Sequence, residues 1–182
     1  MSRVGIFLAD GFEEIEGLTV VDILRRAGID ISMICINGKK KVTGAHGIAL
    51  DTDEDIVQCD PDKLDMLVLP GGMPGTLNEE ASPVVQAAID YCVKNDRYVS
   101  AICAAPSILG KKGLLEGKTA VCYPGFETAL TGAAIGSEGV VQDGKFITAR
   151  GAGVAVDFGL RLIQVLCGEK TAAEIRASII CD

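Results

Sequence analysis

The sequence predicts an α/β fold, a doubly wound sandwich of three layers, because short apolar runs alternate with segments of helical periodicity. The runs are rich in Val and Ile, and their hydrophobicity is continuous rather than alternating. Continuous hydrophobicity is typical of parallel strands that helices cover on both faces. The expected strands are Val4–Ala9, Ile31–Ile36, Met66–Pro70, Tyr98–Cys103 and Ala120–Cys122. We therefore expect a mostly parallel sheet in which each strand is followed by a helix.

The segment after the first strand shows the expected helical pattern. Within Glu13–Ala27, apolar residues such as Ile15, Leu18 and Val21 follow a spacing near 3.6, and Gly28 supplies a stop. The segments 83–94, 155–167 and 171–177 are predicted to be helices on the same grounds.

Two segments interrupt the alternation of strands and helices. In Val140–Thr148, Asp143-Gly144 separates two β-like runs, and Asp-Gly tolerates the positive φ of a tight turn. We expect a small antiparallel hairpin there and a second β excursion over Val42–Leu50. No repeat, low-complexity tract or linker divides the chain, so residues 1–182 are expected to form a single domain.

The composition excludes several classes of function. Hydrophobic residues make up 48% of the 182 residues and charged residues 23%, which is the balance of a globular domain. The formal net charge of −8 disfavours nucleic acid and anionic lipid as partners. No apolar run approaches the ~20 residues of a membrane-spanning helix, and the first run is too short for a signal peptide. We expect a cytoplasmic protein that binds neither nucleic acid nor membrane.

The seven cysteines are odd in number and include no CxxC pair. In a reducing compartment they are expected to be free thiols rather than a disulfide framework or a zinc site. The only histidine, His46, lies in the expected β excursion, far along the chain from the cysteine discussed next. This disfavours a Cys–His–Asp triad and a metal centre, so no cofactor is expected.

Cys103 stands where the fourth expected strand meets a helix, because Pro106 is suited to the first turn of a helix. Such a sharp turn resembles the nucleophile elbow of hydrolases, although the flanking glycines of that motif are missing. The positive end of a helix dipole favours a thiolate and lowers the thiol pKa below about 8.5. The alternative is that Cys103 is unreactive and only packs as a small apolar side chain at the end of a buried strand.

The glycine pair Gly71-Gly72 follows the third expected strand, at the edge of the sheet where ligands bind. Glycine lets backbone N–H groups approach an oxyanion, so Gly72 and Ala104 are candidate donors beside Cys103. The alternative is an ordinary turn between strand and helix. The chain contains no GxxxxGK[ST] motif, which disfavours nucleotide phosphates as ligands.

Three glutamates lie near the start of the first expected helix. Glu13 and Glu14 are expected to be solvated charges that complement the helix dipole. Glu16 follows them on a helix whose apolar side faces the sheet, so it is expected near the carboxyl edge of the strands. A buried Glu16 would have a raised pKa and could exchange protons with Cys103 as one coupled unit.

Three motifs together resemble the DJ-1/ThiJ/PfpI superfamily and, within it, the branch of DJ-1 and its YajL-like relatives. They are Glu13-Glu14-Ile15-Glu16, Leu69-Pro70-Gly71-Gly72 and Ala101-Ile102-Cys103-Ala104-Ala105-Pro106, with Thr148-Ala149-Arg150-Gly151 and 21–28 adding to the match. The resemblance covers essentially the whole chain. It implies a flavodoxin-like sandwich that forms a homodimer, with Cys103 as the functional centre and a protonated Glu16 against it.

The resemblance also implies arginines that hold anions near the thiol, which by position are Arg26 and Arg150. A charge at a helix end and a structural ion pair are the alternatives for these two residues. The chain departs from the family at Tyr123, where DJ-1 has a histidine before the matching proline. A histidine-dependent proton relay is therefore in doubt, although Tyr123 could donate a hydrogen bond at the pocket mouth. Ala104 replaces the histidine of the peptidase branch, which argues against proteolysis.

Two functions follow from these residues and the resemblance. The first is a cofactor-free glyoxalase or deglycase that acts on small 2-oxoaldehydes or their glycation adducts through Cys103 and Glu16. The second is an oxidative-stress sensor or redox-regulated chaperone that uses the same oxidisable cysteine without turnover. We favour the first because elbow, glycine loop and acid together form a site that could carry out a reaction.

Overall fold

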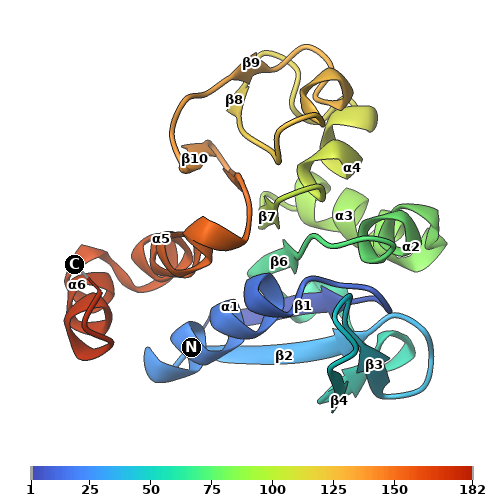
Figure 1. Cartoon of the computed structure of the whole chain (residues 1–182), viewed down its shortest axis with the longest axis horizontal. Coiled ribbons are helices and arrows are strands. Elements are labelled where there is room, and N and C mark those ends of the chain that lie inside the picture. The colour runs from blue at the N-terminus through green and yellow to red at the C-terminus, as the bar shows by residue number, and fades with distance from the viewer. Residues whose placement is uncertain (1, 182) are drawn as a thin grey trace.

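Seven strands form the central sheet of the computed structural model, which describes residues 2–181. The order across the sheet is β10-β11-β7-β6-β1-β2-β5. The strands are β1 Arg3–Leu8, β2 Asp30–Cys35, β5 Glu54–Asp55, β6 Met66–Leu69, β7 Tyr98–Ile102, β10 Val140–Asp143 and β11 Phe146–Ala149. All neighbours run parallel except β10, which pairs antiparallel with β11 (Figure 1). The predicted flavodoxin-like α/β sandwich is confirmed.

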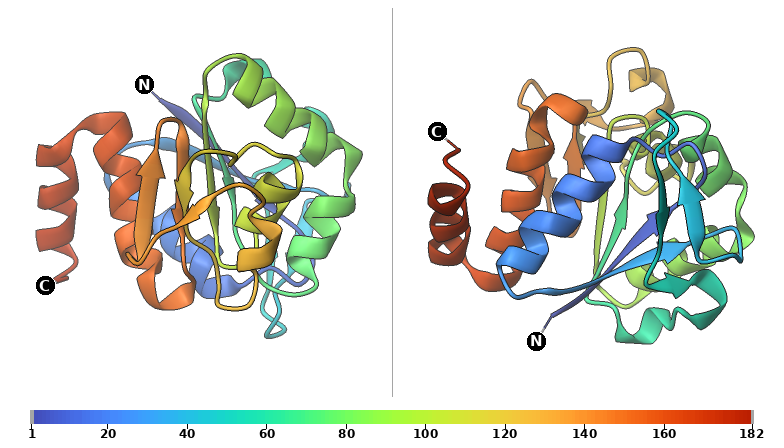
Figure 2. Two further views of the ribbon diagram at one scale, coloured as in Figure 1. Left: turned by 90° about the horizontal axis from the view of Figure 1, so that it is seen from above. Right: turned by 60° about the horizontal axis from the view of Figure 1, so that its bottom comes forward.

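Helices cover both faces of the sheet, and each face has its own hydrophobic core (Figure 2). The helices are α1 Glu14–Arg26, α2 Gly75–Ala81, α3 Pro83–Lys94, α4 Pro106–Lys111, α5 Ala155–Cys167 and α6 Glu169–Ser178. Side chains of α1 and α5, such as Leu24 and Phe158, fill one core. Side chains of α3 and α4, such as Ile89 and Leu109, fill the other. Helix α6 packs on the outside of α5.

Both expected β excursions are hairpins. In the first, β3 (Lys41–Thr43) pairs antiparallel with β4 (Ala49–Asp51). In the second, Asp143 pairs with Phe146, so Gly144 and Lys145 form a two-residue turn. Gly144 has a φ of 60°, as tight hairpin turns require. The second hairpin belongs to the main sheet, because its β11 strand pairs with β7.

The predicted interruption after β2 is confirmed, because the chain there forms the β3–β4 hairpin and then β5 at the sheet edge, with no α-helix directly after β2. One expected strand is wrong. The expected strand Ala120–Cys122 is outside the main sheet. Only β8 (Thr119–Ala120) is extended there, and it pairs with β9 (Ala134–Ile135) as a separate two-stranded ladder. A buried apolar run of three residues can fill a core without joining a sheet, so its composition alone does not assign it to one.

The sheet order places three parallel strands side by side at the centre, namely β1, β6 and β7. Their carboxyl ends therefore meet at one edge of the sheet, where the chain leads into α1, the glycine loop and α4. Among the described residues, no helix is both long enough and apolar enough to cross a membrane. All seven cysteines are free thiols.

Candidate functional site

Cys103 lies between the end of β7 and the start of α4 in a left-handed backbone conformation, with φ at 66°. This conformation is uncommon for a residue with a Cβ, and such strain is typical of functional positions. Two hydrogen bonds hold the strained peptide. The Cys103 N–H donates to the Ala149 carbonyl at 2.9 Å, and the Tyr123 N–H donates to the Cys103 carbonyl at 2.7 Å. The predicted elbow is thus present in the backbone.

The sulfur of Cys103 is surrounded by hydrogen-bond donors and one carboxyl group. The backbone N–H groups of Ala104 and Gly72 donate to it, and the Glu16 side chain shares a hydrogen bond with it. Glu16 is 1% exposed, and its Oε2 accepts from the Gly71 N–H at 2.9 Å. The structure therefore brings together five residues, from three segments of the chain, that the sequence singled out.

Only glycine fits at positions 71 and 72 of the loop after β6, because atoms of neighbouring residues lie very close to the backbone there. A Cβ on Gly71 would lie 2.5 Å from the Cys103 Cβ and 2.6 Å from the Glu16 Oε2. Gly72 has a φ of 97°, and a Cβ there would collide with the backbone nitrogen of Glu13. These contacts explain why the loop can place its N–H groups against both Cys103 and Glu16.

Burial raises the pKa of Glu16 to about 7. Burial raises the pKa of the Cys103 thiol to about 12, with the nearby charge of Glu16 adding to the effect. Two ionisable groups this close titrate as a pair, so between these values the pair holds one proton and one negative charge. Donors on the sulfur favour the charge on Cys103, whereas the N–H groups of Gly71 and Ala152 favour it on Glu16.

The expectation of a lowered thiol pKa at Cys103 is therefore not met. Helix α4 has only six residues, so it offers a small dipole. Burial and the Glu16 carboxylate outweigh the two N–H donors. A thiolate at neutral pH requires that the proton of the pair reside on Glu16, which is the arrangement that the family resemblance implies.

Arg26 is not part of the site within one chain. It follows Glu16 by ten residues along α1, which is about 15 Å along the helix axis. Its Nε donates to Asp22 Oδ2 at 2.7 Å, so it is a surface ion pair near the helix end. This is one of the two alternatives considered for it.

Arg150 and Tyr123 lie beside the elbow. Arg150 is exposed directly after β11. Burial raises the pKa of the nearby Cys122 to about 11, and the charge of Arg150 offsets part of that rise. Tyr123 is 50% exposed, and its ring is 3.2 Å from the place that a Cβ on Gly151 would take. The Glu16 Oε1 is 3.9 Å from the same place. Tyr123 therefore borders the carboxyl group of the candidate site.

Glu14 is buried rather than solvated, contrary to expectation. Its Oε1 accepts from the His46 N–H at 2.8 Å, and its Oε2 is 2.8 Å from the His46 Nδ1. The β3–β4 hairpin, which carries His46, covers this end of α1, and sequence spacing gave no sign of that docking. His46 is thereby held on Glu14 and not on Cys103. Potential metal-ligating atoms of Glu13, Glu14 and His46 lie within 4.8 Å of one another, a grouping that motif spacing could not indicate.

Sequence reasoning also missed Glu79 in α2. Its side chain is completely buried, and neither carboxyl oxygen has a hydrogen-bond partner among residues 2–181. Burial raises its pKa well above the usual value, and the charge of Glu16 adds to the shift. Its neighbours Asn78 and Glu80 are polar as well, so the sequence around it looks like a solvated helix face.

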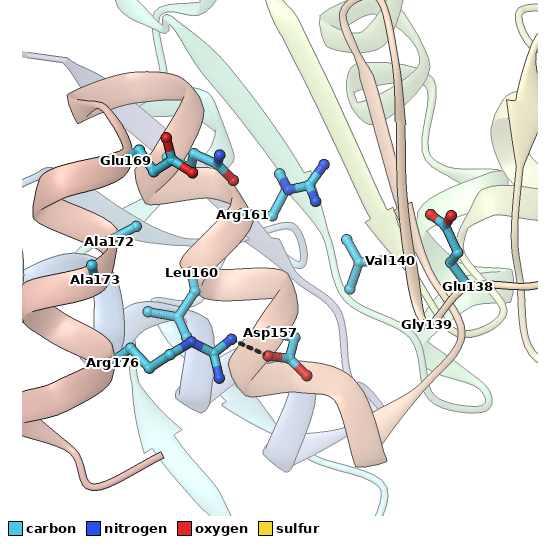
Figure 3. Close-up of a pocket in the computed structure, with 11 residues that line it drawn as sticks. Glu138, Gly139, Val140, Asp157, Leu160, Arg161, Glu169, Ala172, Ala173 and Arg176 are labelled. Atoms are coloured by element: carbon cyan, nitrogen blue, oxygen red, sulfur yellow. Dashed lines mark hydrogen bonds and ion pairs between the residues drawn. The ribbon is translucent and has the colours of Figure 1, made fainter. Parts of the chain in front are cut away.

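A pocket of about 430 Å³ lies elsewhere, between α5, α6 and the start of β10 (Figure 3). Charges of both signs line it, including Arg161 and an ion pair between Arg176 and Asp157. None of the residues around Cys103 lines this pocket. It is separate from the candidate site.

Comparison with known proteins identifies the family. The family model described as the DJ-1/PfpI family matches residues 2–165. This chain belongs to the DJ-1/PfpI family. Protein dj-1beta of Drosophila melanogaster is 33% identical over 177 residues, which cover 96% of this chain and 95% of that protein. The match agrees with the resemblance that the sequence motifs indicated.

Solved structures of family members have the same fold. Drosophila melanogaster DJ-1beta superposes with a TM-score of 0.95 at 32% identity, covering both chains completely. Toxoplasma gondii DJ-1, solved in an oxidized form, gives a TM-score of 0.95 at 30% identity over 99% of this chain and 98% of that chain. A cysteine-to-alanine mutant of a DJ-1 superfamily protein from Salmonella typhimurium gives a TM-score of 0.94 at 32% identity, and the match covers both chains completely.

Proposed function

We propose that this DJ-1/PfpI family member is a cysteine-dependent glyoxalase or deglycase that acts on small 2-oxoaldehydes or their glycation adducts without a cofactor. The hydrogen bond between the Cys103 thiol and the Glu16 carboxyl supports this proposal most directly. It joins a nucleophile to a proton acceptor in one buried pair. The N–H groups of Gly72 and Ala104 are placed to stabilise negative charge as well.

The proposed reaction begins when the Cys103 sulfur adds to the aldehyde carbon of methylglyoxal and its thiol proton passes to Glu16. A C–S bond forms, the π bond of the aldehyde carbonyl breaks, and Glu16 passes the thiol proton on to the aldehyde oxygen, which gives a hemithioacetal and leaves Glu16 ionised. Glu16 then removes the proton from that carbon and returns it to the adjacent ketone carbon, while the hydroxyl proton of the hemithioacetal moves to the ketone oxygen. The product is a thioester of lactate. Water cleaves the thioester, releases lactate and restores the thiol, so no external oxidant or reductant is needed.

The position of the Glu16 pKa fits this role. An acid–base group works best when its pKa is near the working pH, because it can then both accept and release a proton. Burial raises the pKa of Glu16 to about 7. Arg150 and Tyr123 border the site and are proposed to contact the polar atoms of the substrate, with Arg150 supplying positive charge and Tyr123 a hydroxyl group.

Purified protein incubated with methylglyoxal tests the proposal by the lactate that it forms. Wild-type protein is expected to form lactate, while Cys103→Ala and Glu16→Gln lose at least about a hundredfold in rate. Cys167→Ala is a matched control, because Cys167 is an exposed free thiol at the end of α5. Equal lactate formation by wild type and Cys103→Ala would overturn the proposal.

The second candidate is an oxidative-stress sensor or redox-regulated chaperone. A structural relative, Toxoplasma gondii DJ-1, was solved in an oxidized form, which favours keeping this candidate. The same donors around Cys103 would stabilise a sulfinate there. Peroxide titration followed by mass spectrometry is expected to oxidise Cys103 before the other cysteines. Oxidation of all seven at similar doses would argue against a sensor.

We also propose that the chain forms a homodimer in the cytoplasm. Ile15 on α1 and Ile48 in the β3–β4 hairpin are both more than half exposed, and the Ile48 N–H approaches the carboxylate of Glu14, the neighbour of Ile15. Two exposed apolar side chains in one region favour contact with another molecule. Light scattering of wild type and Ile15→Glu tests the proposed homodimer. The charge introduced at position 15 is expected to separate the dimer into monomers.

A further inference from the structure

Glu79 combines complete burial with a lack of partners. Glu79 is 0% exposed, and neither of its carboxyl oxygens has a hydrogen-bond partner among residues 2–181. Thr76, one turn earlier on the same helix, is also buried with a hydroxyl group that has no partner. An ionised carboxylate in such surroundings would be strongly unfavourable, so Glu79 is a neutral carboxylic acid.

Helix α2 connects Glu79 to the candidate site. The helix begins directly after the loop of Gly71 and Gly72, where the Thr76 N–H donates to the Gly72 carbonyl at 2.9 Å, and Glu79 lies about one turn further on. Among charged groups, it is Glu16 of α1 that adds to the raised pKa of Glu79. On α2 itself, the neighbouring Glu80 pairs with Lys111 of α4 at 2.8 Å. From α3, the Gln86 amide donates to the backbone carbonyls of Glu79 and Glu80, at 3.5 and 3.1 Å, and not to the Glu79 carboxyl group. The charged group linked to Glu79 is therefore Glu16, which forms the pair with Cys103.

We propose that Glu79 is a positioning residue of the candidate site, a neutral acid whose O–H dipole turns toward the negative charge of the Cys103–Glu16 pair and stabilises it. The inference rests on the function proposed above. No hydrogen bond among residues 2–181 commits the Glu79 carboxyl to another group, so none fixes the direction of its O–H dipole. In a buried environment a dipole acts on a charge more strongly than in water. A leucine would fill the same space without unpaired polar atoms, so the acid is unfavourable for packing alone.

Alkylation of Cys103 by iodoacetamide between pH 5 and 9, read site by site by mass spectrometry, tests the proposal. Glu79→Leu removes the dipole, so the first ionisation of the pair moves to higher pH and labelling at pH 7 slows by about threefold or more. Glu79→Gln keeps a polar group of similar size and is expected to stay within about twofold of wild type. Thr76→Val, which removes an unpartnered polar atom from the same helix face, is the matched control and is expected to leave the profile unchanged.

Several outcomes would overturn the inference. An unchanged profile in Glu79→Leu would mean that Glu79 only packs, and equal slowing in Glu79→Leu and Glu79→Gln would mean that the dipole is not the cause. If Glu79→Leu fails to fold, Glu79→Met replaces it. The infrared band of a protonated carboxyl should persist at pH 8 in wild type and disappear in Glu79→Gln; its absence from wild type would show an ionised Glu79. Slow, unselective labelling of wild-type Cys103 would instead count against the proposed function, while the comparison of variants would still test Glu79.

Discussion

Glu16 and Cys103 share a hydrogen bond at the carboxyl ends of β1 and β7, although their positions are 87 residues apart in the chain. Backbone N–H groups approach both members of the pair, so either member can carry the negative charge. Several measurements follow from this relationship.

Glu16→Gln should simplify the titration of Cys103. In wild type the pair loses its first proton at about pH 7 and its second at about 12. Without an ionisable partner, Cys103 is expected to titrate once, at a value between these two. The pH dependence of alkylation measures this shift. A midpoint that stays near 7 in Glu16→Gln would show that the two groups are not coupled.

Glu79 should make the fold less stable as the pH rises. Its pKa is raised in the folded protein, so above the unfolded value of about 4.3 folding takes up a proton. The free energy of unfolding then falls by about 1.4 kcal/mol per pH unit from this group alone. Urea denaturation at pH 5 and pH 7 should show a stabilising effect of Glu79→Gln that grows over this range. The expectation fails if the difference between the two proteins is the same at both pH values.

Gly71→Ala should disrupt the pair without removing either member. The added Cβ would meet the Cys103 Cβ at 2.5 Å and the Glu16 Oε2 at 2.6 Å. We expect a loss of stability of about 1–3 kcal/mol from overpacking, together with loss of lactate formation. Gly153→Ala is the control, because a Cβ at Gly153 meets no heavy atom within 4 Å. Thermal melts of both variants measure the loss of stability, and the lactate assay measures the loss of activity.

The single histidine offers a direct check on the β3–β4 hairpin. The hydrogen bond to Glu14 and the charges of Glu13 and Glu14 raise the pKa of His46. A proton NMR titration should therefore give a value above 6.5 in wild type and a lower one in Glu14→Gln. The stabilising effect of the contact should be complete at pH values below 6.5 and should disappear as the pH rises through the raised pKa. Identical titrations would mean that the hairpin does not rest on Glu14.

The sequence was informative where local pattern decides the structure. Continuous apolar runs identified β1, β2, β6 and β7, and the abrupt change from strand to Pro106 located the elbow. Glu16 also lies near the carboxyl ends of the strands, as expected, and is buried there, because α1 faces the sheet along a regular apolar stripe that includes Val20 and Leu24.

The missed features depend on contacts between distant segments. Glu14 is buried only because the loop after β3 folds over it, and Gly44 leaves space for its carboxyl group. Glu79 lies in a helix of seven residues, too short for a hydrophobic period to show which face is inward. The thiol pKa of Cys103 was predicted in the wrong direction because burial and the effect of Glu16 act through space rather than along the sequence.

The strained peptide at Cys103 is fixed by segments that are synthesised after it. Its N–H group needs the carbonyl of Ala149, and its carbonyl needs the N–H group of Tyr123. A ribosome-bound chain that ends before residue 149 therefore lacks one support of the elbow. The conformation of Cys103 is in this sense completed only after the chain has been made as far as β11.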